Sequence, residues 1–206
     1  MAEPRFQRRK EDRPREITEA ALDVFAEKGY AGARVNDVAK RAGVSKGLLY
    51  LYFKTKEDLF KAVVRSFVSP QVEALQAAVE TTGLSTEEFL RGPFLDIAKR
   101  LPKSPARVLV RLMISEGPKH PDLVAWYWEN VISKAIAALR QLIRAGVQSG
   151  ELRESAVEEF PQLLVSPVLM SVLWQIVFQK HHALDTDAFI EAHVDLLLEA
   201  LKVESP

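Results

Sequence analysis

The chain has 206 residues, with 28 Lys and Arg against 28 Asp and Glu, and 48% of its residues are hydrophobic. This composition is typical of a globular protein with a sizeable core, and it excludes a chain that is disordered throughout. Cysteine is absent, which excludes disulfides, thiolate zinc sites and cysteine nucleophiles and suits a reducing compartment. The first residues, MAEPRFQRRKED, contain no apolar run, so we expect a cytoplasmic protein without a secretory signal.

Charge is distributed unevenly along the chain. Residues 1–70 hold fifteen Lys and Arg and ten Asp and Glu, a net charge of +5, and the remainder carries −5. A basic N-terminal part beside an acidic remainder favours a protein in which only the N-terminal part contacts a polyanion. A chance asymmetry between two ordinary domains is the alternative, and charge alone does not decide between them.

Residues 1–12 form a basic arm that we expect to be disordered in the absence of DNA; its cations are Arg5, Arg8, Arg9 and Lys10. The arm is either a solvated tail or a segment that reaches phosphates or the minor groove. A first helix is predicted from Pro14, a favoured residue in a first turn, to the residue before Gly29. Its apolar residues recur at intervals of three and four and predict one buried stripe.

Two short helices are predicted next. The first, residues 35–42, ends at Gly43, which is free to take a positive φ angle. Ser45 then caps the second, residues 46–53. Two short helices joined by such a turn have the form of a helix-turn-helix, whose second helix enters the major groove of DNA.

The rest of the chain is predicted to be helical as well, because no stretch shows the sustained alternation of a strand. Capping-box spacings begin a fourth helix at Thr55 and a fifth at Ser85, and the Gly92-Pro93 pair kinks or splits the fifth. Further helices are expected near residues 104–117, 121–149, 155–181 and 186–203. We therefore predict an all-α protein of about nine helices, with a helix-turn-helix domain at 13–66 and a regulatory domain at 67–203.

One segment, residues 160–179, carries no charge and is nearly long enough to cross a bilayer. It contains two prolines, two serines and three glutamines, and the chain has no second such segment. A charge-free helix of this kind is more often buried against other helices, so we expect burial and no membrane span.

The stretch from Arg34 to Glu57, RVNDVAKRAGVSKGLLYLYFKTKE, is more specific than a generic helix-turn-helix. Together with the preceding AALDVFAEKGYAGARV and the following DLF, it resembles the tetracycline-repressor (TetR) family of bacterial regulators. The remainder resembles that family loosely, in length, helicity and the phrase AGVQSGELR. The resemblance implies a three-helix DNA-binding domain, a helical ligand-binding and dimerisation domain, and a homodimer that a small ligand releases from palindromic operator DNA.

The resemblance also assigns DNA-facing positions, namely Arg34, Ser45, Lys46, Leu48, Leu49, Tyr50, Tyr52 and Lys56. Among these, Tyr50 and Lys56 match phosphate-contacting positions, whereas Lys46, Leu48 and Leu49 match positions that contact bases. Two residues depart from the family pattern. Arg34 stands where a helix-capping Ser or Thr is common. Leu49 stands where a small or hydroxylated residue is common, so its contact is expected to be apolar, to a thymine methyl group.

The last two predicted helices are apolar on more than one side. A partner's equivalent pair would cover them in a four-helix bundle, and packing within one chain is the alternative. Aromatic and Met residues nearby predict an apolar pocket for an apolar or amphipathic ligand, although such residues belong to a core more often than to a binding site. The pocket residues we predict are Phe94, Met113, Trp126, Trp128, Met170 and Trp174.

Two other classes of function are alternatives to a DNA-binding regulator. An enzyme is disfavoured because the four histidines, His120, His181, His182 and His193, form no metal-ligand spacing, and no glycine-rich phosphate loop occurs. We therefore expect no catalytic residue, no metal and no cofactor. A helical interaction module without DNA binding is the second alternative, and the intact basic and tyrosine positions of the motif disfavour it.

Overall fold

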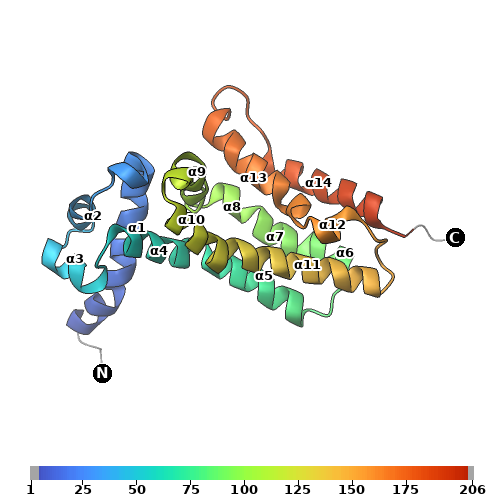
Figure 1. The fold of residues 1–206 in the computed structure, drawn as a ribbon, viewed down its shortest axis with the longest axis horizontal. Helices are drawn as coiled ribbons and strands as arrows, with labels where there is room; N and C mark the ends of the chain where they lie inside the picture. The colour runs from blue at the N-terminus through green and yellow to red at the C-terminus, as the bar shows by residue number, and fades with distance from the viewer. Residues whose placement is uncertain (1–4, 204–206) are drawn as a thin grey trace. The chain divides into compact units, whose positions relative to one another are not determined.

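The computed structural model describes the backbone of residues 5–203 and the side chains of residues 13–203. Regular structure in this range is helical, apart from one isolated antiparallel bridge between Leu152 and Lys202. The α-helical segments are labelled α1 to α14 in Figure 1, and several continue into one another through π-helical turns. The all-α prediction is confirmed, and the nine predicted helices correspond to runs of these shorter segments.

The first four helices are α1 (Arg5–Gly32), α2 (Val35–Arg41), α3 (Lys46–Tyr52) and α4 (Lys56–Phe67). Helix α1 begins inside the segment predicted to be a disordered arm; Met1–Pro4 and the side chains of the arm's cations lie outside the described residues. As predicted, the main part of α1 ends at Gly29, whose backbone is non-helical (φ 71°, ψ 176°). A last helical turn follows, from Tyr30 to Gly32.

The predicted caps are present in this part of the chain. The Ser45 side chain accepts a hydrogen bond from the backbone N–H of Leu48 at the start of α3. Thr55 and Asp58 form a reciprocal capping box at the start of α4. Gly43 takes a positive φ of 65° in the turn between α2 and α3. Local sequence signals therefore fix the ends of the helix-turn-helix.

The later helices are α5 (Ser69–Thr81), α6 (Thr86–Phe89), α7 (Leu95–Ala98), α8 (Arg100–Lys103), α9 (Arg107–Glu116), α10 (Pro121–Tyr127), α11 (Ser133–Gln148), α12 (Ala156–Glu159), α13 (Gln162–Val177) and α14 (Thr186–Leu201). A π turn over Leu90–Phe94 joins α6 to α7, at the predicted Gly-Pro irregularity. A second π turn, Trp128–Ile132, interrupts the predicted helix at 121–149. The predicted fourth helix breaks at Val68, between α4 and α5.

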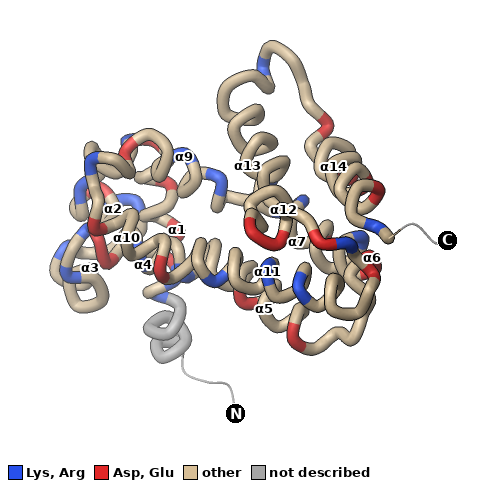
Figure 2. Tube along the Cα trace, turned by 45° about the vertical axis from the view of Figure 1, so that its right-hand side comes forward, with Lys and Arg blue, Asp and Glu red and all other residues tan. Residues whose placement is uncertain are grey.

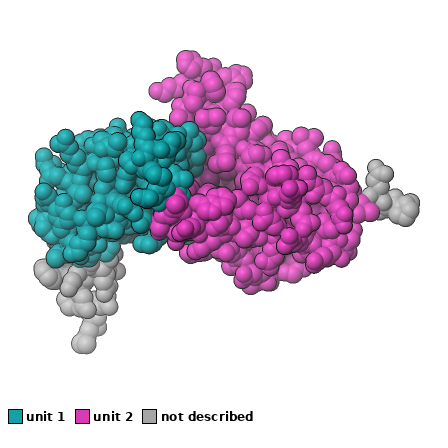
Figure 3. Space-filling view, viewed as in Figure 1, with its two compact units in different colours: residues 1–70, 108–124 teal, residues 71–107, 125–206 magenta. Residues whose placement is uncertain are grey.

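The chain divides into two compact units, which Figure 3 colours separately. Unit 1 comprises residues 1–70 and 108–124, and unit 2 comprises residues 71–107 and 125–206. The break after Pro70 lies close to the predicted boundary at residues 66–67. However, residues 108–124, which the sequence predicted to be part of the regulatory domain, pack with the helix-turn-helix in unit 1.

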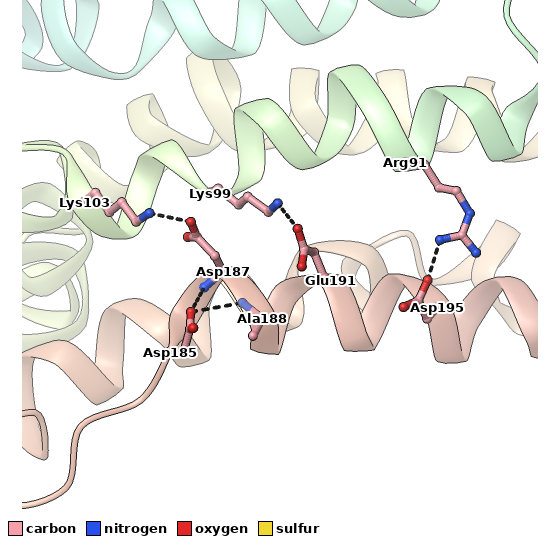
Figure 4. Close-up of polar contacts among 8 residues, drawn as sticks. All are labelled: Arg91, Lys99, Lys103, Asp185, Asp187, Ala188, Glu191 and Asp195. Carbon is pink, nitrogen blue, oxygen red and sulfur yellow. Dashed lines mark hydrogen bonds and ion pairs between the residues drawn. The ribbon is translucent and has the colours of Figure 1, made fainter.

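The core of unit 2 is formed by α5 to α7 and α11 to α14, with Phe89, Leu90, Leu139, Ile143 and Leu164 among its most deeply buried side chains. A row of ion pairs ties α14 to the segment from the first π turn to α8, as Figure 4 shows: Arg91 with Asp195, Lys99 with Glu191, and Lys103 with Asp187. The acidic partners are four residues apart, so they lie on one face of α14.

Helix α13 carries no charged residue and is therefore tan along its length in Figure 2. One face is buried as predicted, through Leu164, Pro167, Val168, Ser171 and Val172. The other face exposes apolar side chains, so α13 is not covered on all sides within the chain. Within the described residues, no helix has both the length and the apolar character needed to cross a membrane.

Candidate nucleic-acid interface

The helix-turn-helix is built around a small buried centre. Val38 and Ala39 of α2 and Leu49 of α3 are almost fully buried. The turn between the helices is closed by the N–H of Val44, which donates to the carbonyl of Ala39 at 3.0 Å. The buried apolar residues and this turn fix the orientation of α3 relative to α2, and they leave one side of α3 exposed to solvent.

The exposed side of α3 carries Lys46, Gly47, Tyr50 and Leu51. The ammonium of Lys46 lies 5.8 Å from the centroid of the Tyr50 ring. Leu48 and Tyr52 are half-buried, and the Tyr52 ring packs near Phe53. The structure therefore places three of the predicted residues, Lys46, Tyr50 and the capping Ser45, at the accessible surface of one short helix.

The prediction that Leu49 faces DNA was wrong. Its side chain has no exposed surface, because it points from α3 into the centre of the domain. Leu51, which the sequence analysis did not select, is 74% exposed instead. The two leucines are two residues apart, so they lie on opposite sides of a helix, and only the pattern of burial distinguishes them.

Lys56 is directed into the domain rather than into solvent. Its ammonium donates to the backbone carbonyls of Tyr30 at 2.7 Å and Ala31 at 3.2 Å, and it lies 4.5 Å from the centroid of the Tyr30 ring. Lys56 thus caps the last turn of α1 with a positive charge, which is a structural role. A phosphate contact by Lys56 remains a prediction.

Cations on α1 and α2 differ from those of α3 in that several are paired with acids. Arg41 bonds Glu27 and lies near Asp23, and these carboxylates raise its pKa. Lys28 bonds Asp37 at 2.9 Å and lowers the pKa of that carboxyl group. Basic and acidic residues accordingly occur together around α2 in Figure 2. Arg34, Lys46 and Lys54 are exposed, and Arg34 provides no side-chain cap for α2, as the sequence predicted.

The end of α1 is also held by α9, a contact within unit 1 that the sequence did not reveal. The two carboxylate oxygens of Glu116 accept hydrogen bonds from the backbone N–H groups of Tyr30 at 2.8 Å and Ala31 at 2.6 Å. Arg111 donates to the carbonyl of Ala26 at 2.5 Å. The ring of His120 lies 4.8 Å from that of Tyr30. Burial, with a smaller contribution from the nearby Glu57 carboxylate, raises the pKa of Tyr30.

The predicted ligand-binding residues do not share one environment. Met113 lies in unit 1 and the other five lie in unit 2. Phe94 is buried in the core of unit 2, whereas Trp128 and Met170 are about half exposed. The Trp174 indole N–H donates to the carbonyl of His182 at 2.8 Å, and Trp126 is half-buried. Their part in ligand binding remains a prediction.

Two polar groups in unit 2 were missed by the sequence analysis. Burial raises the pKa of Tyr127, which lies between the two predicted tryptophans in the sequence, to about 12. The Ser171 hydroxyl on α13 is buried and has no hydrogen-bond partner among the described residues. A buried polar group without a partner is uncommon in folded proteins. In the described part of the chain, no group of His, Asp and Glu is arranged to hold a metal ion.

Comparison with known proteins identifies both halves of the chain. Residues 17–63 match the model for bacterial regulatory proteins of the tetR family, and residues 85–197 match the tetracyclin repressor-like C-terminal domain. The fatty acid metabolism regulator protein of Bacillus subtilis is 28% identical over 148 residues, which cover 70% of this chain and 74% of that protein. The HTH-type transcriptional regulator RutR of Escherichia coli K12 is 31% identical over 138 residues, which cover 66% and 62%.

Among solved structures, the transcriptional regulator FadR from Bacillus subtilis in complex with stearoyl-CoA has a TM-score of 0.74 at 24% identity. The alignment covers 89% of this chain and 96% of that one, so the two share a fold along most of their length. The matched C-terminal model alone spans more than half of the chain. The chain therefore belongs to the TetR family of DNA-binding, helix-turn-helix transcriptional regulators.

Proposed function

We propose that the chain is a cytoplasmic, ligand-responsive repressor that binds palindromic operator DNA as a homodimer. DNA binding is supported chiefly by the accessible side of α3, where Lys46 and Tyr50 are exposed beside each other. An ammonium group and a phenol hydroxyl there supply the charge and the hydrogen bonds that phosphates and base edges require. Arg34, Ser45, Leu48, Tyr52 and Lys56 form the remainder of the proposed interface, and Leu49 is excluded by its burial.

The dimer part is supported by apolar surface on the last helices. Exposed apolar side chains occur on α13 at Leu163, Leu169, Met170, Leu173, Ile176 and Val177, and on α14 at Phe189 and Leu196. Exposed apolar side chains in this number are typical of a protein interface, and α13 and α14 of a second copy would cover them. A two-fold dimer then presents two α3 helices, which suits half-sites about 34 Å apart, one turn of DNA.

The ligand part is supported by unit 2. The FadR structure from Bacillus subtilis that this chain resembles holds stearoyl-CoA, an amphipathic molecule, and the sequence match from the same organism is named a fatty acid metabolism regulator protein. The aromatic residues Trp126, Trp128 and Trp174, the phenol of Tyr127 and the unpartnered hydroxyl of Ser171 all belong to unit 2. These residues suit a ligand with a long apolar chain and one polar head, because a small number of polar groups is enough to orient an otherwise apolar ligand.

The experiment for DNA binding is selection of duplexes from a random pool with the full-length protein, followed by affinity measurement. Lys46→Ala and Tyr50→Phe should weaken binding to the selected duplex by about 1–3 kcal/mol without changing circular dichroism. Lys134→Ala, an exposed lysine on α11, is the matched control and should bind like the wild type. Selection of no duplex at low salt would contradict the proposal and favour a helical interaction module without DNA binding.

The ligand proposal is tested on the same complex. Stearoyl-CoA should release the duplex from the wild-type protein, whereas coenzyme A alone should not. By linkage, the duplex should weaken stearoyl-CoA binding by the same factor, which calorimetry with and without DNA measures. Tyr127→Phe should reduce stearoyl-CoA affinity while leaving DNA affinity unchanged. Equal stearoyl-CoA affinity in the presence and absence of DNA would exclude this ligand as the switch.

A further inference from the structure

The outermost face of α3 contains two residues whose presence the fold does not explain, Gly47 and Leu51. Leu51 has the largest exposed fraction, 74%, of the large hydrophobic residues that are exposed in the described part of the chain. Gly47 and Leu51 are four residues apart and therefore lie on one helical face. Leu49, which is fully buried, lies on the other side of the helix.

Gly47 has no structural requirement to be glycine. Its φ angle is not positive, and a Cβ atom built on it would meet no other atom within 4 Å. Glycine within a helix destabilises it relative to alanine, because it loses more backbone entropy on folding. A glycine at a position with room for a side chain is explained if another molecule approaches the helix backbone at this point.

Leu51 is likewise unfavourable in the isolated chain. A leucine side chain that remains in water contributes nothing to the core and retains the hydration cost that burial removes. The neighbouring exposed residues are polar or basic, among them Lys46, Tyr50 and Lys54. An exposed apolar side chain on a segment that also exposes cations suits a polyanion that offers an apolar group, rather than an apolar protein surface.

DNA offers such a group in one place. The C5-methyl group of thymine projects into the major groove and distinguishes thymine from the other bases there. We propose that Gly47 and Leu51 are specificity-determining residues: Gly47 lets the backbone of α3 lie close to the base edges, and Leu51 contacts a thymine methyl group in each half-site. This inference rests on the proposed DNA-binding function and assigns to Leu51 the apolar contact that Leu49 cannot make.

The test uses full-length protein and a duplex selected from a random pool. Leu51→Ala should bind this duplex about fourfold more weakly for each half-site, the loss that corresponds to one buried methyl group. Each thymine is then replaced in turn by 2′-deoxyuridine, which lacks only the methyl group. One replacement per half-site should weaken binding of the wild type and leave binding of Leu51→Ala unchanged. Ile114→Ala is the control, because Ile114 is an aliphatic side chain on α9 that is 61% exposed. Each deoxyuridine replacement should weaken DNA binding by this variant by the same factor as it weakens binding by the wild type.

Gly47→Ala provides an independent measurement. Because alanine favours a helix, the variant should melt at the same or a higher temperature, yet bind DNA more weakly, on the order of tenfold, because the methyl group holds the helix away from the bases. Gly92→Ala is the matched control, since a Cβ there also meets nothing within 4 Å, and it should leave DNA affinity unchanged.

The outcomes distinguish the contacts proposed for Gly47 and Leu51 from the DNA-binding function on which they depend. Selection of no duplex by the wild type contradicts the proposed function itself. A selected duplex that Leu51→Ala binds like the wild type, or a half-site in which no deoxyuridine replacement depends on Leu51, overturns the thymine contact while DNA binding stands. Wild-type affinity in Gly47→Ala overturns the close approach of the backbone.

Discussion

A Cβ atom on Gly29 would clash with Oε1 of Glu116, although the two residues are far apart in the sequence. Gly29 also has a φ of 71° with an extended ψ of 176°, a region that residues with side chains rarely adopt. The glycine thus allows the chain to turn and lets the Glu116 carboxylate reach the backbone N–H groups of Tyr30 and Ala31. In this way α9 holds the end of α1 within unit 1.

This contact predicts that Gly29→Ala destabilises the protein by about 2–4 kcal/mol, from backbone strain together with the displaced carboxylate. Glu116→Ala should cost about 1–3 kcal/mol, because it leaves two backbone donors without their charged acceptor. Chemical denaturation measures both. Gly83→Ala is the control: it has a positive φ of 58° but meets nothing within 4 Å, so it should cost only about 1 kcal/mol.

The double variant Gly29→Ala with Glu116→Ala separates the clash from the strain. In the double variant the carboxylate that the new methyl group would meet is absent. The free energy of unfolding should therefore fall by less than the sum of the decreases in the two single variants. Strict additivity would show that the close approach of the two residues has no energetic consequence.

Lys56 is predicted to be a structural residue as well as a candidate DNA contact. Lys56→Met removes the hydrogen bonds to the carbonyls of Tyr30 and Ala31 while keeping most of the aliphatic side chain. The free energy of unfolding should fall by about 1–2 kcal/mol. Lys46→Met on the exposed face of α3 is the comparison and should leave stability unchanged while weakening DNA binding. If Lys56→Met keeps wild-type stability and loses DNA affinity, its phosphate role is the dominant one.

The sequence predicted most of what local chemistry determines. Thr55 and Asp58 form the capping box that their spacing indicates, and Gly43 takes the positive φ that a turn requires. Leu49 and Leu51 could not be assigned in the same way, because a seven-residue helix is too short for periodicity to distinguish its buried leucine from its exposed one. The contact of Glu116 with Tyr30 and Ala31 joins distant segments through backbone donors, which leave no side-chain pattern to recognise.

Acid stability is predicted to depend on Glu87 in unit 2. Hydrogen bonds from Lys202 and then Arg91 lower the pKa of its carboxyl group below the ordinary value of 4.5. A carboxyl group with a lowered pKa in the folded state stabilises that state above the unfolded pKa, and this contribution is lost as pH falls through the folded pKa. Glu87→Gln should therefore melt at a lower temperature than the wild type at pH 7, and the difference should shrink below about pH 4.

The control for this measurement is Glu129→Gln, an exposed glutamate for which no ion pair is seen among the described residues. It should melt like the wild type at both pH values. A difference between Glu87→Gln and the wild type that stays constant from pH 7 to pH 3 would contradict the ionic origin of the stabilisation.

The proposed dimer makes the last prediction. Leu173 on α13 is 37% exposed and lies among other exposed apolar side chains, so a second copy would bury it against apolar neighbours. Leu173→Glu places a charge there, and burial of an unpaired carboxylate costs several kcal/mol, which is comparable with the stability of an ordinary interface. Light scattering should find a dimer for the wild type and a monomer for this variant.

Ile114→Glu introduces the same charge at an exposed position on α9 and should remain dimeric. The monomer should also lose affinity for a palindromic duplex more than for a single half-site, since only the dimer engages both halves at once. A wild-type protein that is monomeric at micromolar concentration would refute the assembly.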